Sequence, residues 1–513
     1  MWFTWRAVLL LVTLIYITRE GDANECAPRS FGENRIVCVC NATYCDDTPD
    51  NDPKVLANGT VYWYVSSEEG LRMQMSSAHI GSCSDSNSVV LNINTAEKYQ
   101  TILGYGAAFT DSAGIHISSL SQPVQEQLLR SYFDWTGSRY SLARIPIGGT
   151  DFSTRPYTYD DGNADPTLQN FRLAQEDYKY KIPYVKKAVK LNPNVKIFSA
   201  VWSPPAWMKT NDRINGSGFL KTEYYQVYAD YIVKFLEEYK KNDLDVWAVS
   251  TGNEPMDAFA PGNRLNCLGW IPETQREWIA NNLGPTLENS NHNKTLILYL
   301  DDQRLFIPWE VNKVFMNKKA KDYVSGIAVH WYTDFIVPPT QLDKTHDLHP
   351  EKFILMTEAC TGSEFFEERK VILGLWERGV IYILSIIQYM NHWGVGWVDW
   401  NIVLDQSGGP NWIKNYVDAA IIVNAEKDEF YKQPMYYAIK HFSRFVARGS
   451  VRVSISEALN IEATAFVTPA DEVVVVAYNK NPLATDVVLN DPNKGPICLE
   501  LPAHSMNTVI YAK

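Results

Sequence analysis

The sequence has no stretch of 18 uninterrupted apolar residues, the length that usually spans a bilayer, so we expect no transmembrane helix. Glycine (28) and proline (26) are too few in 513 residues for a collagen-like or linker-dominated architecture. Positive charge is also scarce, because 47 Lys and Arg face 59 Asp and Glu. The resulting net charge of −12 repels phosphate backbones and disfavours nucleic acid as a partner.

Several sequence motifs of common enzyme classes are absent. The chain contains neither a G-x-S-x-G nucleophile elbow nor a G-x-x-x-x-G-K-[ST] phosphate-binding loop. The one dinucleotide-like turn, at Gly104, carries Phe109 in place of the third glycine of G-x-G-x-x-G. We therefore expect neither a cofactor nor a catalytic metal. By contrast, a hydrophobic content of 46% and 16 Trp residues indicate large folded cores.

The first 22 residues are predicted to be a secretory signal peptide. Arg6 precedes an apolar run, Ala7–Ile17, which is too short to cross a membrane and matches the central region of such peptides. No clean cleavage motif follows, so cleavage is placed only between about Tyr16 and Asn24. The alternative is an uncleaved anchor.

Glycosylation sequons and cysteines also indicate a secretory compartment. Four N-x-[ST] sequons are present, at Asn41, Asn58, Asn215 and Asn293. Four cysteines follow the signal within twenty residues, a spacing that favours disulfides in an oxidising lumen. Of the three possible connectivities we prefer pairing in sequence order, Cys26–Cys38 and Cys40–Cys45. Cys83 and Cys498 are candidates for a third bridge, whereas Cys267 and Cys360 are expected to be free thiols.

The central part of the chain alternates between strands and amphipathic helices. In the segment 225–240, for example, apolar residues recur at the i, i+3, i+4, i+7 spacing of a helix. Eight such strand–helix alternations predict an α/β fold, a (β/α)₈ TIM barrel, rather than a doubly wound sheet. The strand candidates are Thr101–Gly106, Ser141–Ile147, Val195–Trp202, Val246–Thr251, Thr295–Leu300, Gly326–Trp331, Phe353–Thr357 and Gly394–Trp400.

Both ends of the chain are rich in β-type alternation and contain no convincing helix. They predict an accessory β-sandwich built from 53–100 and 450–513. The remaining divisions are a small disulfide-linked β domain, 23–52, completed by about 402–433, and the barrel itself, 101–401 with about 434–449.

Two glutamates at strand ends are the strongest candidates for catalysis. Glu254, in Thr251-Gly-Asn-Glu-Pro255, ends the fourth strand candidate, and Glu358, in Met356-Thr-Glu-Ala-Cys360, ends the seventh. In a TIM barrel both lie on the carboxyl-terminal rim, where active sites are built. Paired carboxyls are what glycoside hydrolysis requires, since one protonates the leaving oxygen and the other acts at the anomeric carbon.

The same rim carries polar groups with interleaved tryptophans, which suits a hydroxyl-rich ring held against aromatic faces. Any single tryptophan could instead belong to the core. The rim residues are Arg144, Asp151, Trp202, Asp301, Asp302, Arg304, His330, Trp331, Tyr332, Trp397, Asp399 and Trp400.

A series of short strings identifies a family resemblance that runs from about Cys26 to the C-terminus. In order they are CVCNATYC, RPYTYD, SPPAWMKTN, GNEP, CLGW, DDQR, AVHWY, TEAC, GWVDWN, GGPNW and YKQPM. Together they resemble glycoside hydrolase family 30. The resemblance implies a barrel with a β-sandwich and a small N-terminal sheet. It also implies a retaining β-glucosidase that removes glucose from glucosylceramide.

The resemblance also assigns roles to individual residues. By motif, Glu254 matches the acid/base and Glu358 the nucleophile, while Arg144 matches a buried partner on the rim. The remaining matches are to residues that hold the sugar or border the two carboxyls: Asp151, Trp202, Asn253, His330, Tyr332 and Trp400.

Partners and location follow from the resemblance as expectations. It implies a saposin-type activator, and a lysosomal transport receptor that binds a helix resembling 418–428 (DAAIIVNAEKD). The expected location is the lysosome lumen, peripherally associated with the membrane and reached through the secretory pathway. Two other functions remain open, namely another glycoside specificity, such as a steryl glucoside, and a non-catalytic sugar- or lipid-binding protein.

Overall fold

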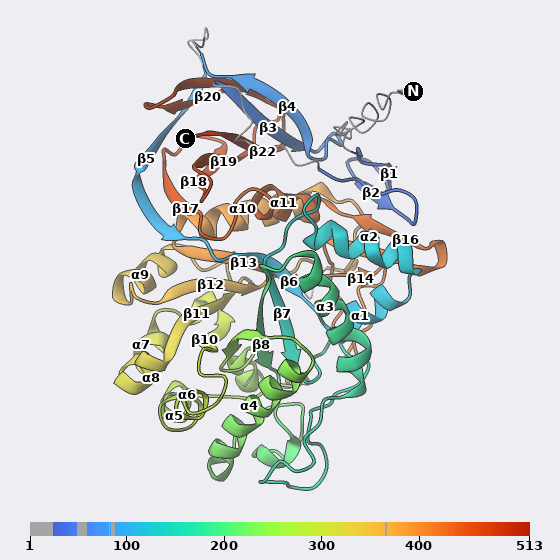
Figure 1. Ribbon diagram of the computed structural model, residues 1–513, viewed down its shortest axis with the longest axis vertical. Helices are drawn as coiled ribbons and strands as arrows, with labels where there is room; N and C mark the ends of the chain where they lie inside the picture. Colours follow the sequence, from blue (N-terminus) through green and yellow to red (C-terminus); the bar gives the residue numbers. More distant parts are fainter. Residues whose placement is uncertain (1–23, 49–58, 82, 84–87, 365–366) are drawn as a thin grey trace, which may run out of the picture.

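The computed structural model describes residues 24–48, 59–81, 83, 88–364 and 367–513 (Figure 1). The predicted signal peptide and the sequon at Asn58 lie outside these residues. The described strands form three sheets, namely a closed parallel barrel, a nine-stranded sheet and a five-stranded sheet. Within the described segments, no helix combines the length and the apolar character needed to cross a bilayer.

The barrel contains eight parallel strands in the order β6-β7-β8-β9-β10-β11-β12-β13, closed by pairing of β13 with β6. This confirms the predicted TIM barrel. The first barrel strand begins at Gly104 rather than Thr101, because Thr101 ends a strand of the sandwich. The strands are β6 (Gly104–Ala108), β7 (Leu142–Ile147), β8 (Lys196–Val201), β9 (Val246–Ser250), β10 (Leu296–Gln303), β11 (Val324–His330), β12 (Phe353–Glu358) and β13 (Gly394–Asn401).

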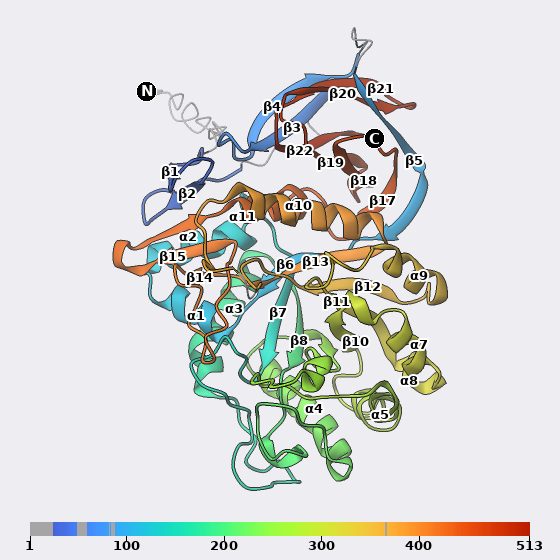
Figure 2. The same cartoon turned by 180° about the vertical axis from the view of Figure 1, so that it is seen from behind.

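Helices surround the barrel (Figures 1 and 2). They bury apolar residues on one face, as α4 and α10 do. In α4 the predicted stripe is buried as expected, including Tyr231, Phe235 and Tyr239. The α-helices are α1 (Asp111–Ser118), α2 (Gln122–Phe133), α3 (Ile182–Leu191), α4 (Tyr225–Lys241), α5 (Pro272–Trp278), α6 (Gly284–Glu288), α7 (Trp309–Phe315), α8 (Lys318–Tyr323), α9 (Thr340–Leu348), α10 (Trp376–Asn391) and α11 (Pro434–Ser443).

The nine-stranded sheet combines both ends of the chain, as predicted for the sandwich. Its alternating residues enclose a separate apolar core. Helices α10 and α11 lie between this sheet and the barrel (Figure 1). Cys83 and Cys498 form a disulfide, with 5.8 Å between their Cα atoms. The strand order is β21 (Gly495–Leu501), β20 (Thr485–Asp491), β5 (Val89–Thr101), β17 (Val451–Ile455), β18 (Ile461–Val467), β19 (Glu472–Asn479), β22 (Ser505–Ala512), β3 (Thr60–Ser67) and β4 (Gln74–His79).

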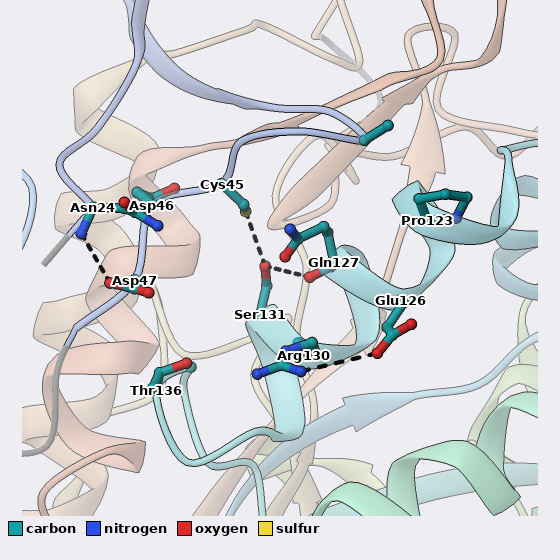
Figure 3. A pocket seen from close by; sticks show the side chains of 12 residues that line it. Asn24, Cys45, Asp46, Asp47, Pro123, Glu126, Gln127, Arg130, Ser131 and Thr136 are labelled. Carbon is teal, nitrogen blue, oxygen red and sulfur yellow. Dashed lines mark hydrogen bonds and ion pairs between the residues drawn. The ribbon is translucent and has the colours of Figure 1, made fainter. Parts of the chain in front are cut away.

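The five-stranded sheet joins the N-terminal disulfide-linked segment to a late part of the chain. Its disulfides are Cys26–Cys38 and Cys40–Cys45. Beside it lies a polar hollow of about 370 Å³, where Cys45 Sγ approaches Ser131 Oγ of α2 to 3.4 Å (Figure 3). The strand order is β1 (Pro28–Ser30), β2 (Ile36–Cys40), β16 (Glu429–Lys432), β15 (Ile421–Asn424) and β14 (Leu404–Asp405).

The segment 418–428 is not the helix that the resemblance implied. It contains β15 and a single 3₁₀ turn, Ala425–Lys427, and its first residue, Asp418, is fully buried beside Arg378. The run Ile421-Ile-Val423 has the β-branched character of a strand, and it pairs antiparallel with β16. A receptor would therefore meet a β-hairpin here rather than a helix.

The described sequons differ in exposure. The Asn293 side chain is exposed, whereas Asn41 and Asn215 are partly buried. The Asn41 side-chain oxygen caps a local turn by accepting hydrogen bonds from the backbone of Thr43 and Tyr44. Asn293 is therefore the most accessible of the three.

Candidate active site

Glu254 and Glu358 meet at the carboxyl-terminal rim of the barrel. Glu358 is the last residue of β12, and Glu254 lies four residues beyond the end of β9. One oxygen of each carboxylate and one nitrogen of His330 all lie within 4.8 Å of one another. The barrel therefore brings together two glutamates that are about 100 positions apart in sequence.

Glu254 occupies a strained backbone position. Its φ of 42° and ψ of 58° are left-handed, which is uncommon for a residue with a side chain. The backbone N–H of Glu254 donates to the carbonyl of Asp301, and Pro255 starts a 3₁₀ turn. These contacts hold the turn that points the carboxylate into the barrel mouth.

The Glu254 carboxylate has two close polar neighbours on the adjacent strands. Its Oε1 accepts a hydrogen bond of 2.6 Å from Gln303 Nε2 at the end of β10. His330 Nδ1, at the end of β11, lies 2.8 Å from the same oxygen. The side chain of Glu254 remains 15% exposed, so the carboxylate can reach a ligand.

The Glu358 carboxylate is bound on both oxygens. Tyr332 donates its hydroxyl to Oε1 at 2.9 Å, and Arg144 donates to Oε2. Arg144 is fully buried and also donates to Asn253 Oδ1 at 2.8 Å and to Asp301 Oδ2 at 3.0 Å. The guanidinium therefore links the two strand ends that carry the glutamates.

Asp301 and His330 complete a buried charge network. Asp301 Oδ1 lies 3.0 Å from His330 Nε2 and accepts a 2.7 Å hydrogen bond from Thr357. Burial alone would raise the pKa of Asp301, but Arg144 and His330 hold it below its usual range. Burial would lower the pKa of His330, but Glu358, Asp301 and Glu254 raise it to about 10. His330 is therefore a cation at physiological pH.

Three further carboxyls of the rim have raised pKa values. Burial raises the pKa of Glu358, although His330 and Arg144 partly offset the effect. Burial followed by repulsion from Glu254 raises the pKa of Asp257 to about 9 and raises that of Asp302 well above its usual value. Burial and mutual repulsion therefore favour a retained proton within this group of carboxyls.

A pocket of about 270 Å³ opens beside the two glutamates. Trp202 and Trp400 form part of its wall as a stacked pair, with ring centroids 5.1 Å apart and planes inclined by 18°. Asp151 lines the pocket and accepts hydrogen bonds from Asn411 (3.0 Å) and Asn415 (3.1 Å). Aromatic faces beside fixed polar groups are typical of a sugar-binding site.

Comparison with known proteins identifies the family. Residues 102–446 match the glycosyl hydrolase family 30 TIM-barrel domain, and residues 449–509 match the β-sandwich domain of the same family. The chain belongs to glycoside hydrolase family 30. It is therefore a glycoside hydrolase, as the paired glutamates predicted.

Individual relatives agree with this family 30 assignment. The chain is 42% identical over 500 residues to the mouse protein named lysosomal acid glucosylceramidase, covering 96% of each chain. It is 40% identical over 524 residues to putative glucosylceramidase 3 of Caenorhabditis elegans, covering 99% of each. Among solved structures, SrfJ from Salmonella typhimurium matches with a TM-score of 0.82 and 27% identity, over 88% of this chain and all of SrfJ.

The structure brings the predicted family 30 site residues together, with three qualifications. Arg304 turns away from the pocket and binds Gln388 and the carbonyl of Val337, so it supports the barrel wall. Trp397 packs against the ring of Tyr382 behind the rim. Asp399 accepts a hydrogen bond from the hydroxyl of the same tyrosine. The prediction that these three face the ligand was therefore too broad.

Sequence reasoning missed several side chains of the site, including Gln303, Asn411 and Asn415. Each lies within or beside a string that carried the resemblance, DDQR or GGPNW, but neither string says which atom faces the site. Asn411 and Asn415 reach Asp151 only because their loop folds back across about 260 residues of chain.

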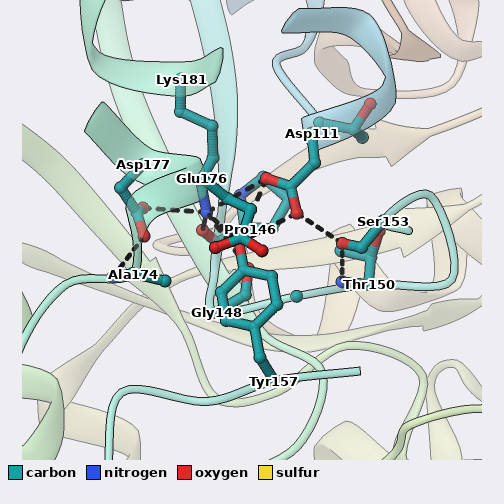
Figure 4. A network of polar contacts seen from close by, with 12 residues as sticks. Asp111, Pro146, Gly148, Thr150, Ser153, Tyr157, Ala174, Glu176, Asp177 and Lys181 are labelled. Carbon is teal, nitrogen blue, oxygen red and sulfur yellow. Dashed lines mark hydrogen bonds and ion pairs between the residues drawn. The ribbon is translucent and has the colours of Figure 1, made fainter. Parts of the chain in front are cut away.

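The loop that carries Asp151 rests on a buried polar network around Lys181 (Figure 4). Lys181 Nζ is 2.9 Å from Asp177 and 3.8 Å from Asp111, and it donates to the carbonyl of Gly148 at 3.2 Å. Asp111 accepts a 2.6 Å hydrogen bond from Ser153. The network therefore holds both ends of the loop 148–153, Gly148 through Lys181 and Ser153 through Asp111.

Replacing Lys181 by Met should destabilise the fold by about 3–5 kcal/mol, because Asp111 and Asp177 would lose their buried cation. Lys190 is an exposed lysine on α3, and its replacement by Met should cost less than about 0.5 kcal/mol. Urea unfolding monitored by tryptophan fluorescence measures both variants. Equal midpoints for the two variants would show that the network does not stabilise the loop.

Two groups of potential metal ligands occur among the described residues. The first, Cys40 with Cys45 and Asp46, has its sulfurs in a disulfide. The second consists of Glu254, His330 and Glu358. In this second group the cations Arg144 and His330 already lie against the carboxylates. The donor set therefore suits proton transfer and attack at carbon rather than metal binding.

Proposed function

We propose that the chain is a retaining β-glucosidase that hydrolyses glucosylceramide to glucose and ceramide. The observation that supports it best is the approach of one oxygen of Glu254 and one of Glu358 to within 4.8 Å. Retaining glycosidases hold their carboxyls about 5–5.5 Å apart, whereas inverting enzymes need about 6.5–9.5 Å to admit a water molecule. The spacing here favours direct attack on the sugar.

The surroundings of the two glutamates support different roles. Glu358 lies against Arg144 and Tyr332, which stabilise its anionic form, so we assign it as the nucleophile. Glu254 is more exposed than Glu358, and its Oε1 lies against Gln303 and His330 rather than against a guanidinium, so we assign it as the acid/base. Neighbouring Asp301 stays ionised and balances the charge of Arg144 and His330.

The reaction follows in two steps. Glu254 donates its proton to the glycosidic oxygen while ionised Glu358 attacks the anomeric carbon, and the ceramide alcohol leaves. Glu254 then removes a proton from water, which attacks the glucosyl ester and frees glucose with its configuration retained. Asp151 and Asn253 offer polar contacts to the sugar hydroxyls, and Trp202 and Trp400 offer an aromatic wall.

The substrate and location rest on the relatives. The mouse relative is named a lysosomal acid glucosylceramidase and covers 96% of this chain. By analogy, this chain acts on glucosylceramide at a lipid surface in the lysosome lumen, aided by a saposin-type activator. A transport receptor would contact the segment 418–428, which contains β15 and the turn that follows it.

Activity should have an acidic optimum. As pH falls, Glu358 takes up a proton at a raised pKa and loses its nucleophilicity. At high pH the two coupled carboxyls share no proton, and the leaving group has no acid to receive one from. The pH profile of kcat/KM on an aryl β-glucoside measures both limbs. Equal rates at pH 5 and pH 8 would contradict the two-carboxylate assignment.

The decisive test of the substrate is hydrolysis of glucosylceramide at pH 5 in anionic detergent. Release of β-glucose, observed before mutarotation by NMR, would support both the substrate and the retaining mechanism. If only an aryl β-glucoside is cleaved, the glutamates keep their roles and the substrate is another glycoside, for example a steryl glucoside. If neither is cleaved, the proposed glucosidase activity is wrong.

A further inference from the structure

Lys209 is a fully buried lysine held by three neutral oxygen atoms. Its Nζ donates to Ser203 Oγ at 3.1 Å and to the backbone carbonyls of Ile214 and Cys267, each at 2.7 Å. An ammonium group has three N–H donors, so these bonds use all of them. Burial lowers the pKa of Lys209 to about 8, which leaves the group protonated at pH 5. A buried charge is costly unless its donors are bound, so an apolar side chain could not replace these contacts.

The three acceptors belong to two loops at the carboxyl-terminal rim of the barrel. Two of them lie in the loop between β8 and α4, as Lys209 itself does, and the third, the carbonyl of Cys267, lies in the loop between β9 and α5. A backbone hydrogen bond of 2.8 Å from the N–H of Gly216 to the carbonyl of Leu265 joins the same two loops. The segment 265–267 is therefore fixed at both of its ends, and Lys209 supplies one of the two contacts.

The segment 265–267 forms one wall of the catalytic pocket, which we name the 265–267 wall. All three of its residues line that pocket, whereas Lys209 does not. Asn266 also donates a 2.6 Å hydrogen bond to the carbonyl of Gly149, in the loop that carries Asp151. A shift of the wall would therefore also disturb the loop of a residue that offers a polar contact to the sugar.

The 265–267 wall lies on the side of the acid/base. The loop that contains it begins after β9 and includes Glu254. Burial raises the pKa of the Cys267 thiol to about 11; Lys209 opposes this rise, while Asp257 and Glu254 add to it. The wall is therefore within electrostatic reach of the carboxyl that protonates the leaving group.

We propose that Lys209 is a positioning residue, which holds the 265–267 wall where the bound glycoside meets it. This rests on the proposed function, because it assigns a role in binding the substrate of the same site. Other side chains hold the two catalytic glutamates, and Lys209 takes part in none of those contacts. Its loss should therefore weaken substrate binding more than it slows the chemical steps.

A comparison of Lys209→Met with wild type on an aryl β-glucoside at pH 5 tests the assignment. Methionine has a similar length but cannot donate to either carbonyl. KM should rise about 10–100-fold, the scale of loss for a displaced binding group, while kcat per folded molecule stays within about threefold. Urea unfolding monitored by tryptophan fluorescence gives the folded fraction. A purely structural role would lower only the amount of active enzyme, and hence the apparent kcat, at an unchanged KM.

Lys209→Gln is a second variant in case methionine disturbs folding. The shorter amide keeps two N–H donors without the charge, so its KM should lie between those of wild type and Lys209→Met.

Lys432→Met provides the matched control. Lys432 is also fully buried, on β16, and its Nζ donates to the backbone carbonyl and to Oδ1 of Asp46 in the part of the fold around the five-stranded sheet. Neither residue lines the catalytic pocket. This variant should lose stability but keep the wild-type KM.

The outcomes separate this inference from the proposed function. A wild-type KM in both Lys209 variants would overturn the inference and leave the glucosidase assignment intact. An equal rise of KM in Lys432→Met would also overturn it, because KM would then follow lost stability rather than the wall. Failure of both Lys209 variants to fold, when Lys432→Met folds, would make Lys209 a structural residue and overturn the inference as well. Absence of cleavage by the wild type would overturn the proposed function and the inference together.

Discussion

Replacing Glu358 by Gln should lower kcat on any β-glucoside by at least about 10⁴-fold, the scale of loss seen when a nucleophile is removed. The amide has nearly the same shape as the carboxylate but cannot form a glucosyl ester. Arg144 keeps its contacts with Asp301 and Asn253, so the rim should remain folded. The variant should still bind a glucose-shaped inhibitor, because the pocket walls at Asp151 and Trp400 are unchanged.

Stopped assays over hours and inhibitor titration by calorimetry measure the two effects separately. Glu377→Gln, on the exposed face of α10, is the control for the same chemical change and should keep wild-type turnover. Near-normal turnover in Glu358→Gln would assign the nucleophile elsewhere. Loss of inhibitor binding together with a lowered unfolding midpoint would instead indicate that the substitution damages the rim.

The fold could be predicted because its elements have regular local signals. Eight apolar strands alternated with helical stripes, as in α4, and strand-type alternation at both ends of the chain predicted the sandwich. The start of the first barrel strand was predicted at Thr101 but lies at Gly104. The reason is that Thr101 is the last residue of the sandwich strand Val89–Thr101, which ends two residues before the barrel strand begins. No local feature distinguishes the end of one strand from the start of the next across Ile102 and Leu103.

The candidate site could be predicted where strand ends fix its geometry, and less well where loops do. Glu254 and Glu358 follow strands of a barrel whose symmetry places them on one rim. Asn411 and Asn415 depend on a loop that crosses to Asp151. The buried Lys181 could not be predicted, since its position in the sequence resembles that of a surface lysine on an amphipathic helix.

Replacing Glu254 by Gln should affect substrates according to their leaving groups. With glucosylceramide, whose alkoxide leaving group needs a proton, kcat/KM should fall about 10²–10⁴-fold, the usual range for loss of a general acid. An aryl β-glucoside with an acidic phenol leaves without assistance, so formation of the glucosyl ester should be much less affected. Its breakdown still needs a base to activate water, so the ester should accumulate as a burst of phenol followed by slow turnover.

Two further measurements make the Glu254 prediction specific. Azide attacks the ester without needing a base, so it should accelerate turnover of the aryl substrate in Glu254→Gln but not in wild type. Asp257→Asn is the matched control, because burial and repulsion from Glu254 raise the pKa of Asp257 to about 9 and keep that carboxyl neutral already. The amide therefore replaces an uncharged group, and activity at pH 5 should change less than about tenfold. Equal losses for ceramide and phenol leaving groups in Glu254→Gln, with no response to azide, would argue that Glu254 is not the acid/base.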